Sequence, residues 1–152
     1  MKQFLFLIGV LFFALACKEI YEVPPHSLLS VTITNDSTQL QMSSIVTYQG
    51  IESDSLWNSE TAVPVFTLPL SNKGTTSFRI TLDSKVDTIS IVHTIIQKYA
   101  SMETGFYDEY KLNSIQSTHH RIRSIDITDS LVTTIWHENI KINIRPLPPG
   151  SK

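Results

Sequence analysis

The sequence lacks the disulfides that stabilise many small domains, and it contains no recognisable catalytic motif. Cys17 is the only cysteine among 152 residues, so no disulfide forms within the chain. There is no Gly-x-Ser-x-Gly elbow of a serine hydrolase and no calcium-binding loop of the EF-hand type. The charges nearly balance, with 12 Lys and Arg against 14 Asp and Glu, and no basic cluster indicates a nucleic-acid partner. A domain built from this chain must therefore rely on its hydrophobic core.

Residues 1–16 have the three parts of a secretory signal. Lys2 supplies the positive start, residues 4–13 are apolar, and Ala14 and Ala16 are the small residues before Cys17. The apolar stretch is shorter than the roughly 20 residues that a spanning helix needs. We therefore expect a signal helix that is cleaved rather than a permanent transmembrane segment.

A small-residue site that ends directly in cysteine resembles a bacterial lipobox, in which a diacylglyceryl group is joined to the thiol. Two or three acyl chains would hold the protein on a lipid bilayer, because one chain alone binds only marginally. We therefore predict that Cys17 is the lipidation site. The alternative is ordinary cleavage after Ala16, which leaves Cys17 as a free thiol.

These features predict four segments. Residues 1–16 form a lipoprotein signal peptide, residues 17–27 a lipidated tether, residues 28–145 a β-sandwich domain and residues 146–152 a disordered tail. Pro24 and Pro25 favour an extended spacer within the tether.

The mature chain has the alternating pattern of strands and no convincing amphipathic helix. The pattern predicts strands at 29–34, 44–51, 65–70, 76–82, 86–97, 106–115, 122–127 and 140–145. The clearest turn is predicted at 71–74, and another at 83–85. Segment 86–97 has apolar residues at both parities, so we expect it to be central or covered on both faces. Arg121 and Arg123 share the parity of Ile125 and Ile127, which predicts a bulge or a late strand start. The fold class is therefore an all-β, antiparallel sandwich of about 7–8 strands, Ig-like or Greek-key.

The histidines are the first candidates for chemistry. His119 and His120 are adjacent, so on a strand they point to opposite faces and do not chelate together. One of them could meet His137 and Glu138 across strands as a His-His-carboxylate metal site, but no fixed spacing supports this. Surface histidines are the simpler interpretation, and we expect no metal and no cofactor. His93, at an apolar parity, is predicted to be a hydrogen-bonded core histidine or to lie at a bulge.

The remaining candidates are acidic and aromatic. Asp36, Asp54, Asp83, Asp87, Asp126 and Asp129 lie at or near turns, where aspartate bonds its own backbone. Trp57, Tyr107 and Trp136, with Tyr99 and Tyr110, could form a strip that binds a sugar or a protein partner. Core or rim packing is the competing interpretation for these aromatic residues.

Several segments resemble a family of small, uncharacterised lipoproteins of the Bacteroidota type. They are the lipobox, Leu68–Leu70, Thr75–Phe78, Asp87–Ile91, Thr104–Phe106 leading to Tyr110, and Glu138–Ile144. The resemblance covers residues 28–144 and implies an all-β domain without an assigned activity. Family members often carry a cysteine where this chain has Thr104, so a disulfide of that kind is missing here.

We expect a non-enzymatic lipoprotein of the cell envelope, most readily at the outer membrane. Its partners would be the lipid bilayer, through acylated Cys17, and an envelope protein or glycan. The alternative is a metal-dependent or hydrolytic envelope enzyme that uses His119, His120 and His137. A third possibility is an assembly chaperone, which a concave apolar groove would favour.

Overall fold

The computed structural model describes residue 23 and residues 25–53 and 56–146, and in that part of the chain there are ten strands and no helix. The strands are β1 (Leu28–Asn35), β2 (Val46–Gly50), β3 (Leu56–Asn58), β4 (Val65–Pro69), β5 (Thr75–Leu82), β6 (Lys85–Ser101), β7 (Gly105–Ser117), β8 (Ile122–Ile127), β9 (Leu131–Val132) and β10 (Ile140–Ile144). The predicted signal helix and Cys17 lie outside the described residues. No helix in the described ranges is long and apolar enough to cross a membrane.

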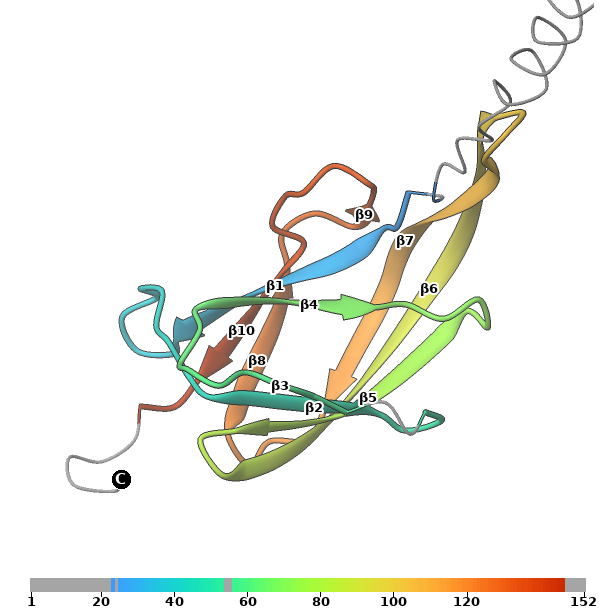
Figure 1. The fold of residues 1–152 in the computed structure, drawn as a ribbon. Coiled ribbons are helices and arrows are strands. Elements are labelled where there is room, and N and C mark those ends of the chain that lie inside the picture. Colours follow the sequence, from blue (N-terminus) through green and yellow to red (C-terminus); the bar gives the residue numbers. More distant parts are fainter. Residues whose placement is uncertain (1–22, 24, 54–55, 147–152) are drawn as a thin grey trace, which may run out of the picture.

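The strands form two sheets (Figure 1). One has the order β4-β1-β10-β8 and the other the order β3-β2-β5-β6-β7-β9. This confirms the predicted all-β fold. The eight predicted strands are all present, and the two additional ones, β3 and β9, are only three and two residues long.

The four-stranded sheet is mixed, whereas a fully antiparallel fold was predicted. β1 pairs in parallel with β10, with Val31 opposite Ile140 and Asn35 opposite Ile144. The strand patterns of the sequence indicate which residues face inward, but they carry no information on the direction of a partner more than 100 residues away.

The core lies between the two sheets and is built from inward-facing side chains of both. Fully buried members include Leu29, Val31 and Ile33 from β1 and Ile140, Ile142 and Ile144 from β10; Ile80 and Leu82 from β5 and Ile89 and Ile91 from β6 face them from the six-stranded sheet. Each fully buried branched side chain contributes about 1.5–3 kcal/mol relative to exposure. This layer replaces the disulfide that the chain lacks.

β1 is buried on both of its faces, and its outer face is polar. Thr34 Oγ1 donates to Asn143 Oδ1 at 2.6 Å, and the main-chain nitrogen of Ser30 donates to Asn139 Oδ1 at 3.0 Å. These bonds pin both ends of the parallel β1–β10 pair. The small hydroxyl residues on the outer face of β1 therefore fit a central strand that is hydrogen-bonded to Asn143 of β10 and to Asn139 just before it.

β6 occupies the central position that was predicted, between β5 and β7, but only one of its faces is covered. Asp87, Ile89 and Ile91 are buried, whereas Val86 and Val92 on the other face are 46% and 39% exposed. Of the two alternatives predicted for this strand, the structure therefore shows the central position and not the covering of both faces. The apolar residues of the outer face are β-branched, which suits a pleated strand without requiring burial.

The turn and bulge predictions are confirmed. Asp83 and Ser84 connect β5 to β6 with φ of 47° and 69°, as a two-residue hairpin turn requires. Gly74 turns the chain before β5 with φ of 76°. In the β10–β8 pairing, Asn143 faces Ser124 and Ile144 faces Ile122, so Arg123 is the extra residue of a bulge.

Candidate binding cleft

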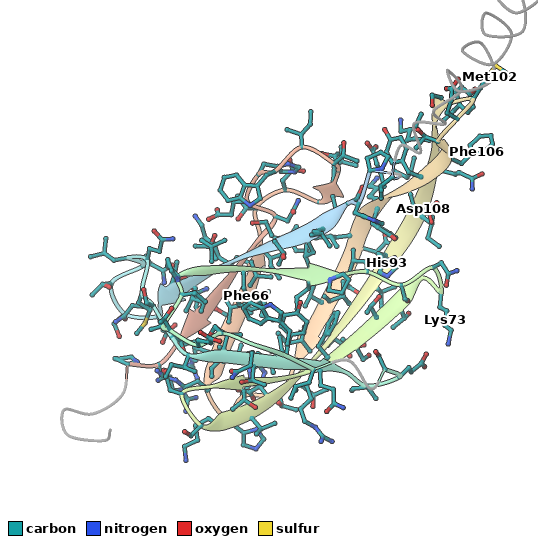
Figure 2. The ribbon with its side chains drawn as sticks, viewed as in Figure 1. Phe66, Lys73, His93, Met102, Phe106 and Asp108 are labelled. Atoms are coloured by element: carbon teal, nitrogen blue, oxygen red, sulfur yellow. The ribbon has the colours of Figure 1, made fainter. Side chains whose placement is uncertain are left out.

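A cleft of about 620 Å³ opens where β2 and β5 meet the connection from β4 to β5. Its volume lies within the range of small-ligand sites. Ile51 and Pro69 line its apolar side, together with Tyr48, Leu70 and Phe78; the polar lining comes from Ser71, Thr75, Thr76 and Ser77. In Figure 2, Lys73 lies on the β4–β5 connection and Phe66 between the two sheets.

Aromatic side chains form the inner wall of the cleft. The rings of Tyr48 and Trp57 stack at 5.1 Å, and Tyr48 contacts Phe78 edge-on at 5.8 Å. Phe66 of the opposite sheet stacks on Tyr48 at 6.3 Å and on Trp57 at 6.5 Å. The cluster thus joins the two sheets and fixes the orientation of Tyr48, whose pKa is raised by burial. The phenol therefore remains neutral at ordinary pH.

A polar network closes the inner end of the cleft. Thr76 Oγ1 accepts from the main-chain nitrogen of Ser71 at 2.8 Å, donates to Ser71 Oγ at 3.1 Å and lies 2.9 Å from His93 Nε2. Tyr110 donates its hydroxyl to the carbonyl of Leu70 at 3.2 Å and packs edge-on against the His93 ring at 5.2 Å. The β4–β5 connection is therefore held against β6 and β7 by side chains that point inward.

The network determines the tautomer of His93. Ser71 Oγ donates its only proton to the carbonyl of Thr75 at 3.0 Å, so it accepts the proton of Thr76. Thr76 then has no proton left for the imidazole, and His93 Nε2–H must donate to Thr76 Oγ1. Nδ1 of His93 is buried without a hydrogen-bond partner in the described part of the chain, and as a bare acceptor it costs less than an unpaired N–H would.

Burial lowers the pKa of His93, which is 3% exposed, so the ring is neutral at pH 7. The prediction of a hydrogen-bonded core histidine is confirmed, and the β6–β7 register also shifts at Val92 and His93. Among the described residues no carboxylate bonds Nδ1, the position at which the third member of a hydrolytic triad orients its histidine. The arrangement fixes a loop.

The rim of the cleft carries an ion pair between Lys73 Nζ and Glu52 Oε2 at 2.7 Å. Both side chains are largely exposed, at 68% and 75%. The hydrogen bond to Lys73, followed by its charge, lowers the pKa of Glu52, and the same bond raises the pKa of Lys73. An exposed pair of this kind contributes little to stability. Because it lies at the mouth of the cleft, it presents both charges to a ligand that enters.

The histidines considered as an alternative metal site do not come together. His120 precedes β8 at the end where Ile122 pairs with Ile144, whereas His137 lies beyond the other end, where Ile127 pairs with Ile140. The length of the ladder, roughly 15 Å, separates them. His119 is exposed beside His120. No group of three or more His, Cys, Asp or Glu within the described residues is placed to hold a metal ion.

The other metal candidates already have partners. Both ring nitrogens of His137 lie 2.8 Å from main-chain carbonyls, those of Ile135 and Leu131, and these bonds raise its pKa. Glu138 pairs with Lys141 at 3.3 Å. Burial acts most strongly on the Glu138 carboxyl and raises its pKa, but bonds from Thr32, Lys141 and Thr128 hold it below the usual value.

The aromatic residues considered as a binding strip do not form one surface. Trp57 belongs to the stack beside the cleft. Tyr107 lines a second, smaller pocket of about 280 Å³ on the far side of Pro69 and Leu70. Trp136 lies in the connection from β9 to β10, where it is 70% exposed. Trp57 stacks on Tyr48 of the cleft lining, and Tyr110 donates to the carbonyl of Leu70 in the same lining, so these two of the five aromatic residues adjoin the cleft.

The aspartates were expected to bond the backbone of their own turns, but Asp87 does not. Its buried carboxylate accepts bonds from Thr118 Oγ1 at 2.7 Å and from the main-chain nitrogens of His120, Arg121 and Ile122 at 2.7–3.0 Å. It therefore clamps the segment in which the chain passes from β7 to β8. Asp129, which accepts from the main-chain nitrogen of Leu131 two residues on, follows the expected pattern.

Comparison with known proteins places the chain in a sequence family. The profile of a family of unknown function, DUF6452, matches residues 42–144, about two thirds of the chain. The chain belongs to this family. The DUF6452 match includes the cleft, the His93 network and the Asp87 clamp, but not β1. No curated protein and no solved structure matches the chain.

The sequence pattern does not reveal the residues that shape the cleft. Ser71 and Lys73 belong to the predicted turn at 71–74, and Thr76 begins the predicted strand at 76–82. One signal was available: Thr76 shares the inward parity of Phe78 and Ile80, so it is a polar residue on the core face. Its partners, however, come from other elements and become visible only in the fold.

Proposed function

We propose that this protein is a non-catalytic binding module of the cell envelope, held at the outer membrane by a lipid on Cys17. The cleft between β2, β5 and the β4–β5 connection would bind an apolar group of an envelope partner. The observation that carries the binding role is the cleft itself, with an aromatic wall, an inner end fixed by His93 and a charged pair at the mouth.

The chemistry of the lining supports binding rather than turnover. The hydroxyl groups of Ser71 and Thr76 are both engaged in bonds that hold the loop, and the imidazole beside them is neutral and buried. Apolar surface with a few fixed polar groups is typical of recognition sites. The lipid attachment rests on the sequence of residues 1–17 alone.

The lipid attachment is tested by metabolic labelling with a palmitate analogue in the native host. We expect label on the wild-type protein and none on Cys17→Ala, with the wild-type protein in the outer-membrane fraction. A labelled Cys17→Ala protein, or an unlabelled wild-type protein released as a soluble form, would contradict this part of the proposal.

The cleft is tested by titration with 1-anilinonaphthalene-8-sulfonate, an apolar probe whose sulfonate suits Lys73 at the mouth. We expect saturable binding at one site, weakened about tenfold by Ile51→Ser because one apolar contact is lost. Val86→Ser is the matched control, since Val86 is similarly exposed, 46% against 56%, on the outer face of β6. Binding that is absent, or that both substitutions weaken equally, would refute a site in the cleft.

A further inference from the structure

The β6–β7 hairpin extends beyond the two sheets as an arm. Figure 1 shows both strands running past the ends of their neighbours, and Figure 2 places Met102 at the tip with Phe106 just below it. Along the same strand β6, Ile89 and Ile91 are fully buried between the sheets, whereas from Lys98 onward every residue but Ser101 is exposed. The arm therefore has no core of its own to cover.

The tip of the arm, residues 99–106, is apolar and nearly uncharged. Met102 is 90% exposed, Phe106 61% and Tyr99 57%, and Glu103 is the only charged residue among the eight. Tyr99 and Phe106 contact each other edge-on across the ladder at 5.4 Å, which keeps both rings at the tip. Exposing three large apolar side chains together indicates a surface that something else covers.

Apart from Glu103, the charged residues of the arm lie below the tip. Lys98 lies opposite Tyr107, Gln97 opposite Asp108 and Ile96 opposite Glu109. The distance from this level to the end of the hairpin is four or so residues, or roughly 13 Å. An end of this length, with apolar and aromatic side chains ahead of the charges, is long enough to reach the depth of about 5–10 Å at which amphipathic segments enter a membrane interface.

The chain that carries Cys17 enters the domain beside this arm. Pro25, His26 and Leu28 line the smaller pocket together with Tyr107 and Asp108 of β7. Eight residues separate Pro25 from Cys17, a reach of at most about 28 Å. A lipidated thiol and the tip of the arm can therefore reach the same plane, on the same side of the domain.

We propose that the tip of the arm, with Tyr99, Met102 and Phe106, inserts into the lipid bilayer interface as a second membrane contact beside the lipidated Cys17. The proposal rests on the lipid attachment proposed above. A lipid on the N-terminal tether alone would not fix the orientation of the domain at the surface. A second contact from the arm fixes its orientation, with the cleft held at a constant height above the membrane.

The test uses the full-length lipidated protein in vesicles of phosphatidylethanolamine and phosphatidylglycerol that contain brominated lipid. Trp57→Phe and Trp136→Phe remove both tryptophans of the chain while keeping aromatic rings. Phe106→Trp then reports from the tip of the arm, and Val86→Trp, on β6 at the opposite end, is the matched control. We expect a blue shift and quenching of Phe106→Trp, reduced by the further change Met102→Ser, and water-like emission from Val86→Trp.

The outcomes separate the two proposals. If Cys17 carries its label but Phe106→Trp emits as in water, the arm is overturned while the lipid attachment stands; the arm then faces a protein partner or solvent. If Cys17 carries no label, the lipid attachment is refuted. The same vesicles are then added to the unlipidated protein, and quenching of the Phe106→Trp emission tests whether the arm inserts. Quenching of Phe106→Trp there supports insertion, and its absence refutes it.

Discussion

The carboxylate of Asp87 on β6 accepts a hydrogen bond from the main-chain nitrogen of Arg121 at 2.7 Å, although 34 positions separate the two residues. The Arg121 guanidinium, with its side chain 4% exposed, pairs with Asp83 at 2.8 Å. Asp83, in the hairpin turn between β5 and β6, and Asp87, on β6 just after that turn, thus hold the segment that passes from the six-stranded sheet to the four-stranded one. The clamp secures the crossing between the sheets.

We expect Asp87→Asn to lower the free energy of unfolding by about 2–4 kcal/mol, because the amide loses the charge and faces main-chain donors with an NH₂ group. Urea unfolding followed by circular dichroism measures the change. Glu60→Gln, at an exposed position, is the control and should leave stability within about 0.5 kcal/mol. Equal stability of the two variants would show that the clamp is not needed.

Asp87 also predicts how stability depends on pH in acid. Burial is the largest single influence and raises its pKa, but the bonds from Thr118, His120, Ile122 and Arg121 together hold the pKa below its usual value. Its contribution is therefore complete above about pH 4 and is lost as the pH falls through the native pKa. The free energy of unfolding, measured at pH values from 5 to 2, should fall more steeply for the wild type than for Asp87→Asn.

His93 predicts a second loss of stability on acidification, at a higher pH than the loss that Asp87 causes. Because burial lowers its pKa, the unfolded chain binds a proton more readily than the folded one below about pH 6.5. Stability should fall from that pH down to the native pKa, and His93→Gln should remove this step. An NMR titration gives the native pKa directly, and a value at or above 6.5 would contradict the buried, neutral ring.

Thr76→Val keeps the shape of the side chain and removes its three hydrogen bonds to Ser71 and His93. We expect a loss of about 2 kcal/mol and faster hydrogen exchange at the amides of Ser71 and Lys73. Thr75→Val, one residue earlier and exposed, is the matched control. If both valine variants exchange alike, the network does not hold the β4–β5 connection.

The two tryptophans should differ in their effect on stability. Trp57→Ala removes the stack on Tyr48 and Phe66, and we expect it to cost about 1–3 kcal/mol. Trp136→Ala, at a side chain that is 70% exposed, should change stability by less than about 0.5 kcal/mol. Thermal unfolding of both proteins makes the comparison. A larger loss from Trp136→Ala would mean that its loop is packed in solution.

Sequence analysis predicted the strands well where one face is buried. The alternation of Phe78, Ile80 and Leu82 in β5 is reproduced by the burial of that strand. It failed for β3 and β9, because three and two residues are too few to show a period. Of the cleft, it anticipated the turn at Gly74 and the buried His93, but not that Thr76 joins them.

Residue types and short, regular spacings specify the fold class, the turns, the inward-facing side chains and the lack of any disulfide. They do not specify that β1 lies parallel to β10, that Asp87 accepts hydrogen bonds from residues between 118 and 122, or that the β4–β5 connection, β2 and β5 enclose a cleft. These features join segments tens of residues apart, whose meeting depends on how the two sheets pack.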